Sequence, residues 1–290
     1  MPEVPGVAVE HRSVALPDGA RLHVAQAGAG PPLVLVHGWP QHWWAWRRLI
    51  EPLAQERRVI CPDLRGLGWS DAPPGRYEKE AWAADLVALL DALDLDRADV
   101  AGHDWGGLVA LLTALDAPER VRTVAAVNIV HPWSRAPSPR ALLALGYQLP
   151  LAVPLAGEQL LRRLPALVHE LIRRGSDPAH RWSDAELDVY AGVLRAPERA
   201  RASSEVYRTF LTRELPAAAR GRRLDRRLTV PALIATGRAD PVVGPRLIAG
   251  LDRHAAARTE THVIERAGHF VPEEQPEALL ALLRAHVRAG

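Results

Sequence analysis

This chain of 290 residues has a single cysteine, Cys61, so no disulfide bond can form within it. Its histidines and acidic residues show no spacing typical of a metal site, and we expect neither a metal nor any other cofactor. No stretch approaches the roughly 20 apolar residues that a membrane span requires. Residues 1–19 lack the apolar core of a signal peptide, so we expect a cytoplasmic protein with no membrane partner.

An excess of charge of one sign is also lacking. The 36 basic and 34 acidic residues leave a net charge of only +2 at pH 7. Lys79 is the only lysine, and several arginines occur in pairs along expected helices, such as Arg162 and Arg163. We interpret these pairs as solvated helix faces and expect no nucleic-acid partner.

The most informative feature present is the hexapeptide GHDWGG at residues 102–107. It has the form of the nucleophile elbow G-x-S-x-G, a sharp turn from strand to helix, with Asp104 in place of the serine. A short, half-apolar stretch at 98–101 precedes it and an apolar run of helix formers at 108–115 follows it, which predicts the required order of strand, turn and helix.

An aspartate at an elbow changes the chemistry. A carboxylate attacking an acyl carbon would give an unstable anhydride, so Asp104 is better suited to displacing a leaving group from an sp3 carbon. The product is an alkyl ester that water can cleave. Epoxides and alkyl halides are suitable electrophiles, and the carboxylate, ionised near neutral pH, needs no base to activate it.

Further parts of a site follow other expected strands. The apolar run 33–36 leads into HGWP at 37–40, where the backbone N–H of Trp39 can point toward the same place as that of Trp105. Two such donors form an oxyanion hole. For His37 we expect a buried role, bonded to loop backbone.

Two more candidates lie near the C-terminus. Asp240 follows an expected strand at 231–236, and His269 follows another at 261–265. Asp104, Asp240 and His269 thus all come just after strands, where open α/β sheets bind ligands. The order nucleophile, acid, histidine is that of the α/β-hydrolases, which predicts a mostly parallel central sheet with helices on both faces.

The chain resembles the α/β-hydrolase fold family, and within it the epoxide hydrolases and their haloalkane dehalogenase relatives. The matching segments are HGWP at 37–40, DLRGLGWSD at 63–71, GHDWGG at 102–107, PERV at 118–121, GRADPVV at 237–243 and AGHFVPEEQPE at 267–277. The resemblance implies an enzyme that opens an epoxide to a vicinal diol, with His269 activating the water that cleaves the ester on Asp104 and Asp240 orienting the imidazole. Some dehalogenases carry the acid at the position of Asn128, but an amide cannot ionise, so Asp240 is favoured.

Residues 134–213 lack a clear strand and contain leucines at helical spacing, so we interpret them as a helical lid inserted between core segments 1–133 and 214–290. In epoxide hydrolases two lid tyrosines protonate the departing oxygen. The stretch 182–190 resembles the one that carries the second of these, which makes Tyr190 the candidate acid. Leu143 occupies the usual place of the first, and Tyr147 can replace it only if the register shifts by one helical turn.

Trp39, Trp105 and Trp133 each follow a strand end, and Phe270 adjoins His269, so we expect these side chains to line an apolar pocket. The expected partners are a small hydrophobic electrophile and water, and the expected assembly is a monomer or homodimer. Dehalogenation of an alkyl halide or haloacid stays open, since the indoles of Trp39 and Trp105 could donate to halide. A non-catalytic small-ligand-binding role is a further alternative.

Overall fold

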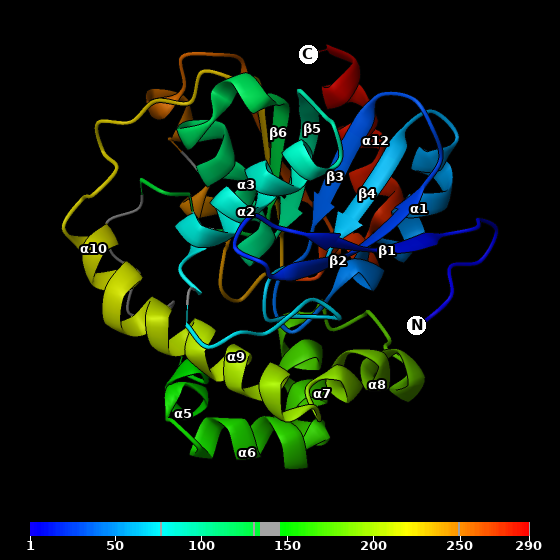
Figure 1. Ribbon diagram of the computed structural model, residues 1–290. Helices are drawn as coiled ribbons and strands as arrows, with labels where there is room; N and C mark the ends of the chain where they lie inside the picture. The colour runs from blue at the N-terminus through cyan, green and yellow to red at the C-terminus, as the bar shows by residue number, and fades with distance from the viewer. Residues whose placement is uncertain (76, 130, 134–145, 249, 290) are drawn as a thin grey trace.

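An eight-stranded sheet forms the centre of the computed structural model, which describes all residues except 76, 130, 134–145, 249 and 290 (Figure 1). The strands run in the order β1-β2-β4-β3-β5-β6-β7-β8. The β1–β2 and β2–β4 pairs are antiparallel and all the others are parallel. The predicted mostly parallel sheet is therefore confirmed. The strands are β1 Glu10–Ala15, β2 Arg21–Ala27, β3 Pro32–Val36, β4 Arg58–Pro62, β5 Ala98–His103, β6 Val121–Val127, β7 Ala232–Gly237 and β8 Thr259–Ile264.

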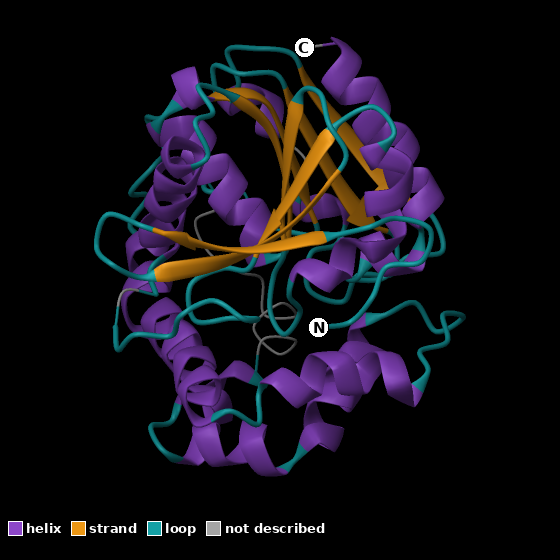
Figure 2. Ribbon diagram, turned by 45° about the vertical axis from the view of Figure 1, so that its right-hand side comes forward, coloured by secondary structure: helices purple, strands orange, loops and turns teal. Residues whose placement is uncertain are grey.

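Apolar residues on both faces of the central strands explain why helices cover both sides. In β3, Leu33 and Leu35 pack with α1 and α12, whereas Val34 and Val36 pack with α2 and α3 on the opposite face. Figure 2 shows helices flanking the sheet on both sides. Outside the inserted segment, the helices are η1 Trp43–Trp46, α1 Arg47–Ala54, α2 Lys79–Ala92, α3 Trp105–Asp116, η2 Pro118–Arg120, η4 Pro245–Leu247, η5 Leu251–His254, α11 Val271–Glu274 and α12 Pro276–Ala289.

A second group of helices lies between β6 and β7 in the chain. It comprises α5 Gln148–Ala152, α6 Ala156–Arg163, α7 Pro165–Gly175, α8 Asp184–Val193, α9 Pro197–Thr209, the π-helix η3 Phe210–Glu214 and α10 Leu215–Ala219. The parallel strands point toward this group (Figure 1), so a site at their carboxyl ends faces it. Helical structure continues past residue 213 through η3 and α10, and Leu143 lies outside the described residues. Within the described part of the chain, no helix is both long and apolar enough to span a membrane.

Candidate active site

Asp104 occupies the sharp turn between β5 and α3. Its backbone has φ 51° and ψ −129°, a conformation that is costly for a residue with a side chain. A Cβ atom on Gly102 would overlap the carbonyl oxygen of Gly106, and one on Gly106 would overlap the carbonyl oxygens of Val36 and His37. The glycines thus allow strand and helix to approach closely enough to hold Asp104 at the tip.

The structure brings together the three residues that follow β5, β7 and β8. The Nδ1 atom of His269 lies 2.9 Å from Asp240 Oδ2, and its Nε2 atom lies 3.6 Å from Asp104 Oδ1. Asp240 is held in turn by the backbone N–H groups of Val242 and Val243, at 2.7 and 2.8 Å. Asn128 donates to Asp240 Oδ2 at 2.7 Å, so this amide supports the acid.

Two carboxylates control the charge of the imidazole. Burial disfavours the charged form of His269, but the fields and hydrogen bonds of Asp240 and Asp104 outweigh burial and raise its pKa from 6.5 to about 10. Burial likewise opposes ionisation of Asp240, but His269 and its other hydrogen-bond donors lower the pKa of this carboxyl below its ordinary value. The two acidic side chains therefore favour the charged form of the His269 imidazole.

Backbone N–H groups also point at the nucleophile. The N–H of Trp39 donates to Asp104 Oδ2 at 2.9 Å. The close approach requires Gly38, since a Cβ there would overlap the Asp104 side chain. Trp105 is the first residue of α3, where N–H groups lack intrahelical partners. His37 is fully buried and bonded to the backbone of Gly38 and Leu64, which confirms its expected role.

A cavity of about 500 Å³ lies beside Asp104 and His269. Its apolar walls include Trp39, Trp105, Leu108, Ile129, Leu171 and Phe270. The expectation that Trp133 lines the pocket is wrong: its indole N–H donates to the carbonyl oxygen of Arg226 at 2.8 Å, and its ring stacks on His254. The loop after β6 thus turns Trp133 away from the cavity.

One tyrosine lines the cavity and a second lies next to it. Tyr147 is the lining residue, and its hydroxyl lies 3.4 Å from that of the buried Tyr207, which sequence reasoning missed. The Trp39 ring packs on both, with centroid distances of 6.3 and 5.0 Å. Burial and the charge of Asp104 raise the pKa of Tyr147 to about 12, and burial also raises the pKa of Tyr207, so both phenols stay protonated. The available signal was scarcity: the chain has only four tyrosines, so each one between residues 134 and 213 was a candidate.

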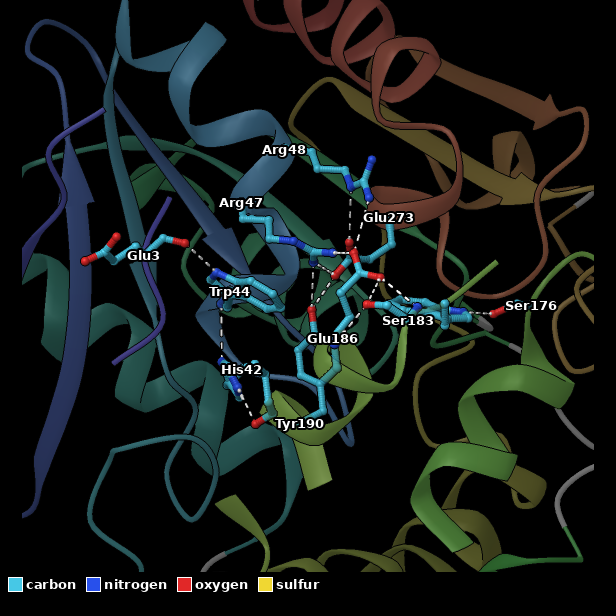
Figure 3. Close-up of polar contacts among 12 residues, drawn as sticks. Glu3, His42, Trp44, Arg47, Arg48, Ser176, Ser183, Glu186, Tyr190 and Glu273 are labelled. Carbon is cyan, nitrogen blue, oxygen red and sulfur yellow. Dashed lines mark hydrogen bonds and ion pairs between the residues drawn. The ribbon is translucent and has the colours of Figure 1, made fainter. Parts of the chain in front are cut away.

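Tyr190 does not reach the cavity, contrary to the sequence prediction. Its hydroxyl donates to the Glu273 carboxylate and lies 3.2 Å from Arg47 Nη1, in a fully buried contact between α8, α1 and α11 (Figure 3). Arg47 also binds Glu273, and its Nη2 donates to Glu186 at 2.6 Å. We call Arg47, Glu186, Tyr190 and Glu273 the Arg47 cluster. Packing of α8 against α1 and α11 directs Tyr190 into this cluster and away from Asp104.

The chain belongs to the α/β-hydrolase fold family, because the family model for that fold matches residues 31–276. Within the family it falls in the epoxide-hydrolase-like branch of hydrolases. It is 32% identical to the soluble epoxide hydrolase of Corynebacterium sp. (strain C12), over 92% of this chain and 93% of that protein. It is 30% identical to bifunctional epoxide hydrolase 2 of Mus musculus over 95% of this chain, but spans only 55% of the length of that relative. The crystallised epoxide hydrolase CorEH has a TM-score of 0.84 and 27% identity, over 97% of this chain and 99% of that one.

Proposed function

We propose that this protein hydrolyses a small hydrophobic epoxide to a vicinal diol through an alkyl ester on Asp104. The observation that carries the proposal is the protonated phenol of Tyr147, which lines the cavity beside the nucleophile, with the hydroxyl of the buried Tyr207 3.4 Å from its own. An epoxide oxygen needs a proton when its C–O bond breaks, whereas a halide does not. Trp39 joins the two groups, since its N–H binds Asp104 and its ring packs on both tyrosines.

In the first step, an oxygen of the Asp104 carboxylate attacks one epoxide carbon. The C–O bond to that carbon breaks, and the departing oxygen takes a proton from Tyr147 or Tyr207. The result is a hydroxyalkyl ester on Asp104 and a phenolate that must be reprotonated. The two adjacent hydroxyls can share the developing charge.

In the second step, His269 takes a proton from a water molecule that attacks the carbonyl carbon of the ester. Formation of the ester prepares His269 for this role, because it removes the negative charge of Asp104, one of the two that raise the imidazole pKa. The imidazolium can then release its proton, through solvent, to the phenolate left by the first step, which restores the phenol and leaves a neutral imidazole as the base. The N–H groups of Trp39 and Trp105 stabilise the oxyanion, and Asp240 stabilises the imidazolium. The ester C–O bond then breaks, and the departing alkoxide takes the proton of the carboxyl group, which releases the diol and restores the Asp104 carboxylate.

We further propose that residues 134–213 act as a lid over a core formed by residues 1–133 and 214–290. This segment supplies both phenols and part of the apolar wall, including Leu171. Closure of such a lid excludes bulk water, which strengthens the electrostatic interactions within the site.

Dehalogenation is the second candidate. The indole nitrogen of Trp39 is buried and has no hydrogen-bond partner in the part of the chain that the structure describes. A free indole N–H at the cavity suits a departing halide ion. The tyrosine pair favours the epoxide, because a halide makes no use of it.

The intact mass of a His269→Gln variant tests both chemistries, since this variant should form the Asp104 ester without hydrolysing it. After incubation with a set of epoxides, a gain equal to a whole epoxide, mapped to Asp104, is expected. A gain equal to an alkyl group without its halogen, after incubation with haloalkanes, would establish the dehalogenase instead. Asp104→Asn is the control that should form no adduct; if it binds ligand and the native protein turns over neither set, a binding role is favoured.

A further inference from the structure

The carboxylate of Glu274 accepts hydrogen bonds from the backbone on both sides of His269. Its Oε2 atom accepts a hydrogen bond of 2.8 Å from the N–H of Gly268, and its Oε1 atom accepts one of 2.8 Å from the N–H of Phe270. The side chain is buried, with 8% of its surface exposed. Glu274 therefore holds the residues immediately before and after the catalytic histidine without touching its ring.

The same carboxylate reaches the segment that follows α7. The N–H of Asp177 donates to Glu274 Oε2 at 2.6 Å, and the N–H of His269 donates to the carbonyl oxygen of Gly175 at 2.7 Å. The two loops are so close that a Cβ on Gly268 would overlap the Gly175 carbonyl oxygen. The loop of His269 and the loop after α7 are thus joined by two hydrogen bonds and one direct backbone contact.

Only a carboxylate of this length fits these donors. Three N–H groups bind two oxygens, and hydrogen bonds to an ionised acceptor are shorter and stronger than neutral ones. A glutamine would offer one acceptor oxygen and turn its NH2 group toward a backbone N–H, so at least one of the three bonds would be lost. An aspartate would keep the charge, but its side chain is shorter by one methylene.

We infer that Glu274 is a positioning residue that fixes His269 relative to Asp104 and Asp240, so that hydrolysis of the ester depends on it and formation of the ester does not. This inference rests on the proposed function. Ester formation uses Asp104, Tyr147 and Tyr207, whereas the Glu274 carboxylate bonds to the backbone of Asp177, Gly268 and Phe270. Hydrolysis requires His269 Nε2 to face a water molecule beside the ester, and misplacement by about 1 Å costs such a step roughly 100-fold.

Single-turnover kinetics of Glu274→Gln with an epoxide that the native protein hydrolyses provide the test. We expect ester hydrolysis to slow by about 10-fold to 100-fold and ester formation to change by less than about threefold. As a result kcat and KM fall together, and the intact mass shows the Asp104 ester accumulating during turnover. Glu277→Gln is the matched control, because it removes the same charge from the exposed start of α12 and should behave as the native protein.

A purely structural role predicts a different result. If Glu274 only stabilises the fold, both steps slow by the same factor and no ester accumulates, which overturns the inference, as does an unchanged rate of hydrolysis. Glu274→Asp retains the charge and serves if the glutamine variant does not fold. Because its side chain is shorter by one methylene, it should still accumulate more Asp104 ester than the native protein.

A measurement without substrate separates this inference from the proposed function. The His269 ring is titrated by NMR in native protein and in Glu274→Asp, which keeps the negative charge near His269. We expect a lower His269 pKa in the variant, because the imidazolium lies farther from its two carboxylates. An unchanged His269 pKa contradicts the positioning role, whatever the substrate. The absence of an adduct on Asp104 in His269→Gln contradicts the proposed function alone.

Discussion

The molecule has two clusters of ionisable groups, whose members His269 and Glu273 lie a few residues apart in the chain. Only the cluster that contains His269 adjoins the cavity. Asp104 and His269 line the cavity, and Asp240 bonds to His269 Nδ1. In the Arg47 cluster, the Tyr190 hydroxyl donates to the buried carboxylate of Glu273, and the Arg47 guanidinium binds Glu273 and the half-buried Glu186.

Both clusters perturb proton binding strongly. The pKa of His269 rises to about 10, whereas burial raises the pKa of Glu273 from 4.5 to about 7 against the opposing effect of Arg47. A perturbed pKa is therefore insufficient evidence of catalysis. The distinguishing feature is the cavity, which Asp104 and His269 line and to which none of the four residues of the Arg47 cluster contributes.

The largest effect on activity is expected at the nucleophile. Asp104→Asn should lower diol formation by about 10⁴-fold or more, because an amide cannot form the alkyl ester. The measurement is the rate of diol formation at saturating epoxide, with circular dichroism to show that the variant folds. Activity within about 10-fold of the native protein would mean that Asp104 is not the nucleophile.

Substitution of the tyrosines should affect the rate near the cavity and the stability in the Arg47 cluster. Tyr147→Phe and Tyr207→Phe should each slow ester formation by about 10-fold to 100-fold, because the first removes the phenol that lines the cavity and the second removes the hydroxyl next to it. Tyr190→Phe is the matched control: the rate should stay within about threefold, while the free energy of unfolding falls by about 1 to 2 kcal/mol through loss of the bond to Glu273. Stopped-flow kinetics and urea unfolding measure the two quantities. If only Tyr190→Phe lost ester formation, Tyr190 would be the residue that protonates the epoxide oxygen.

The Arg47 cluster should instead control stability as a function of pH. The pKa of Glu273 is about 7 in the folded state and about 4.5 when unfolded, so between these values the folded protein binds a proton that the unfolded chain has released. Its contribution to stability therefore falls as pH rises through this window. Between pH 5 and pH 7.5, the free energy of unfolding of native protein should fall by about 1 to 3 kcal/mol more than that of Glu273→Gln. If urea unfolding shows the same change in free energy of unfolding with pH for both proteins, this prediction is wrong.

The smallest effect is expected outside both clusters. Trp133→Phe removes one hydrogen bond to the Arg226 carbonyl but no wall of the cavity, so kcat/KM should change by less than about twofold and stability by about 1 kcal/mol. Trp39→Phe is the comparison, since Trp39 packs on both cavity tyrosines, and its kcat/KM should fall further. Equal kinetic effects of the two substitutions would indicate that Trp133 lines the pocket after all.

Much of the site could be predicted from the sequence because its residues directly follow strands. Asp104, Asp240 and His269 each lie within a few residues of the end of β5, β7 or β8, and the carboxyl ends of parallel strands meet at one edge of a sheet. The glycines around the elbow are similarly local, because their spacing reflects a close approach of strand and helix. Such patterns need no knowledge of how the inserted helices pack.

The tyrosines had no such local marker. Tyr190 and Tyr207 both lie on helices of the inserted segment, α8 and α9, and either could have faced the nucleophile. The charges that draw Tyr190 away belong to Arg47 and Glu273, which are 143 and 83 residues distant in the chain. The sequence by itself determined the family, the sheet and the order of nucleophile, acid and histidine, since local periodicity and strand ends encode them. Only the tertiary structure decided which phenols reach the cavity, because the orientation of a helix on the sheet depends on buried contacts between distant residues.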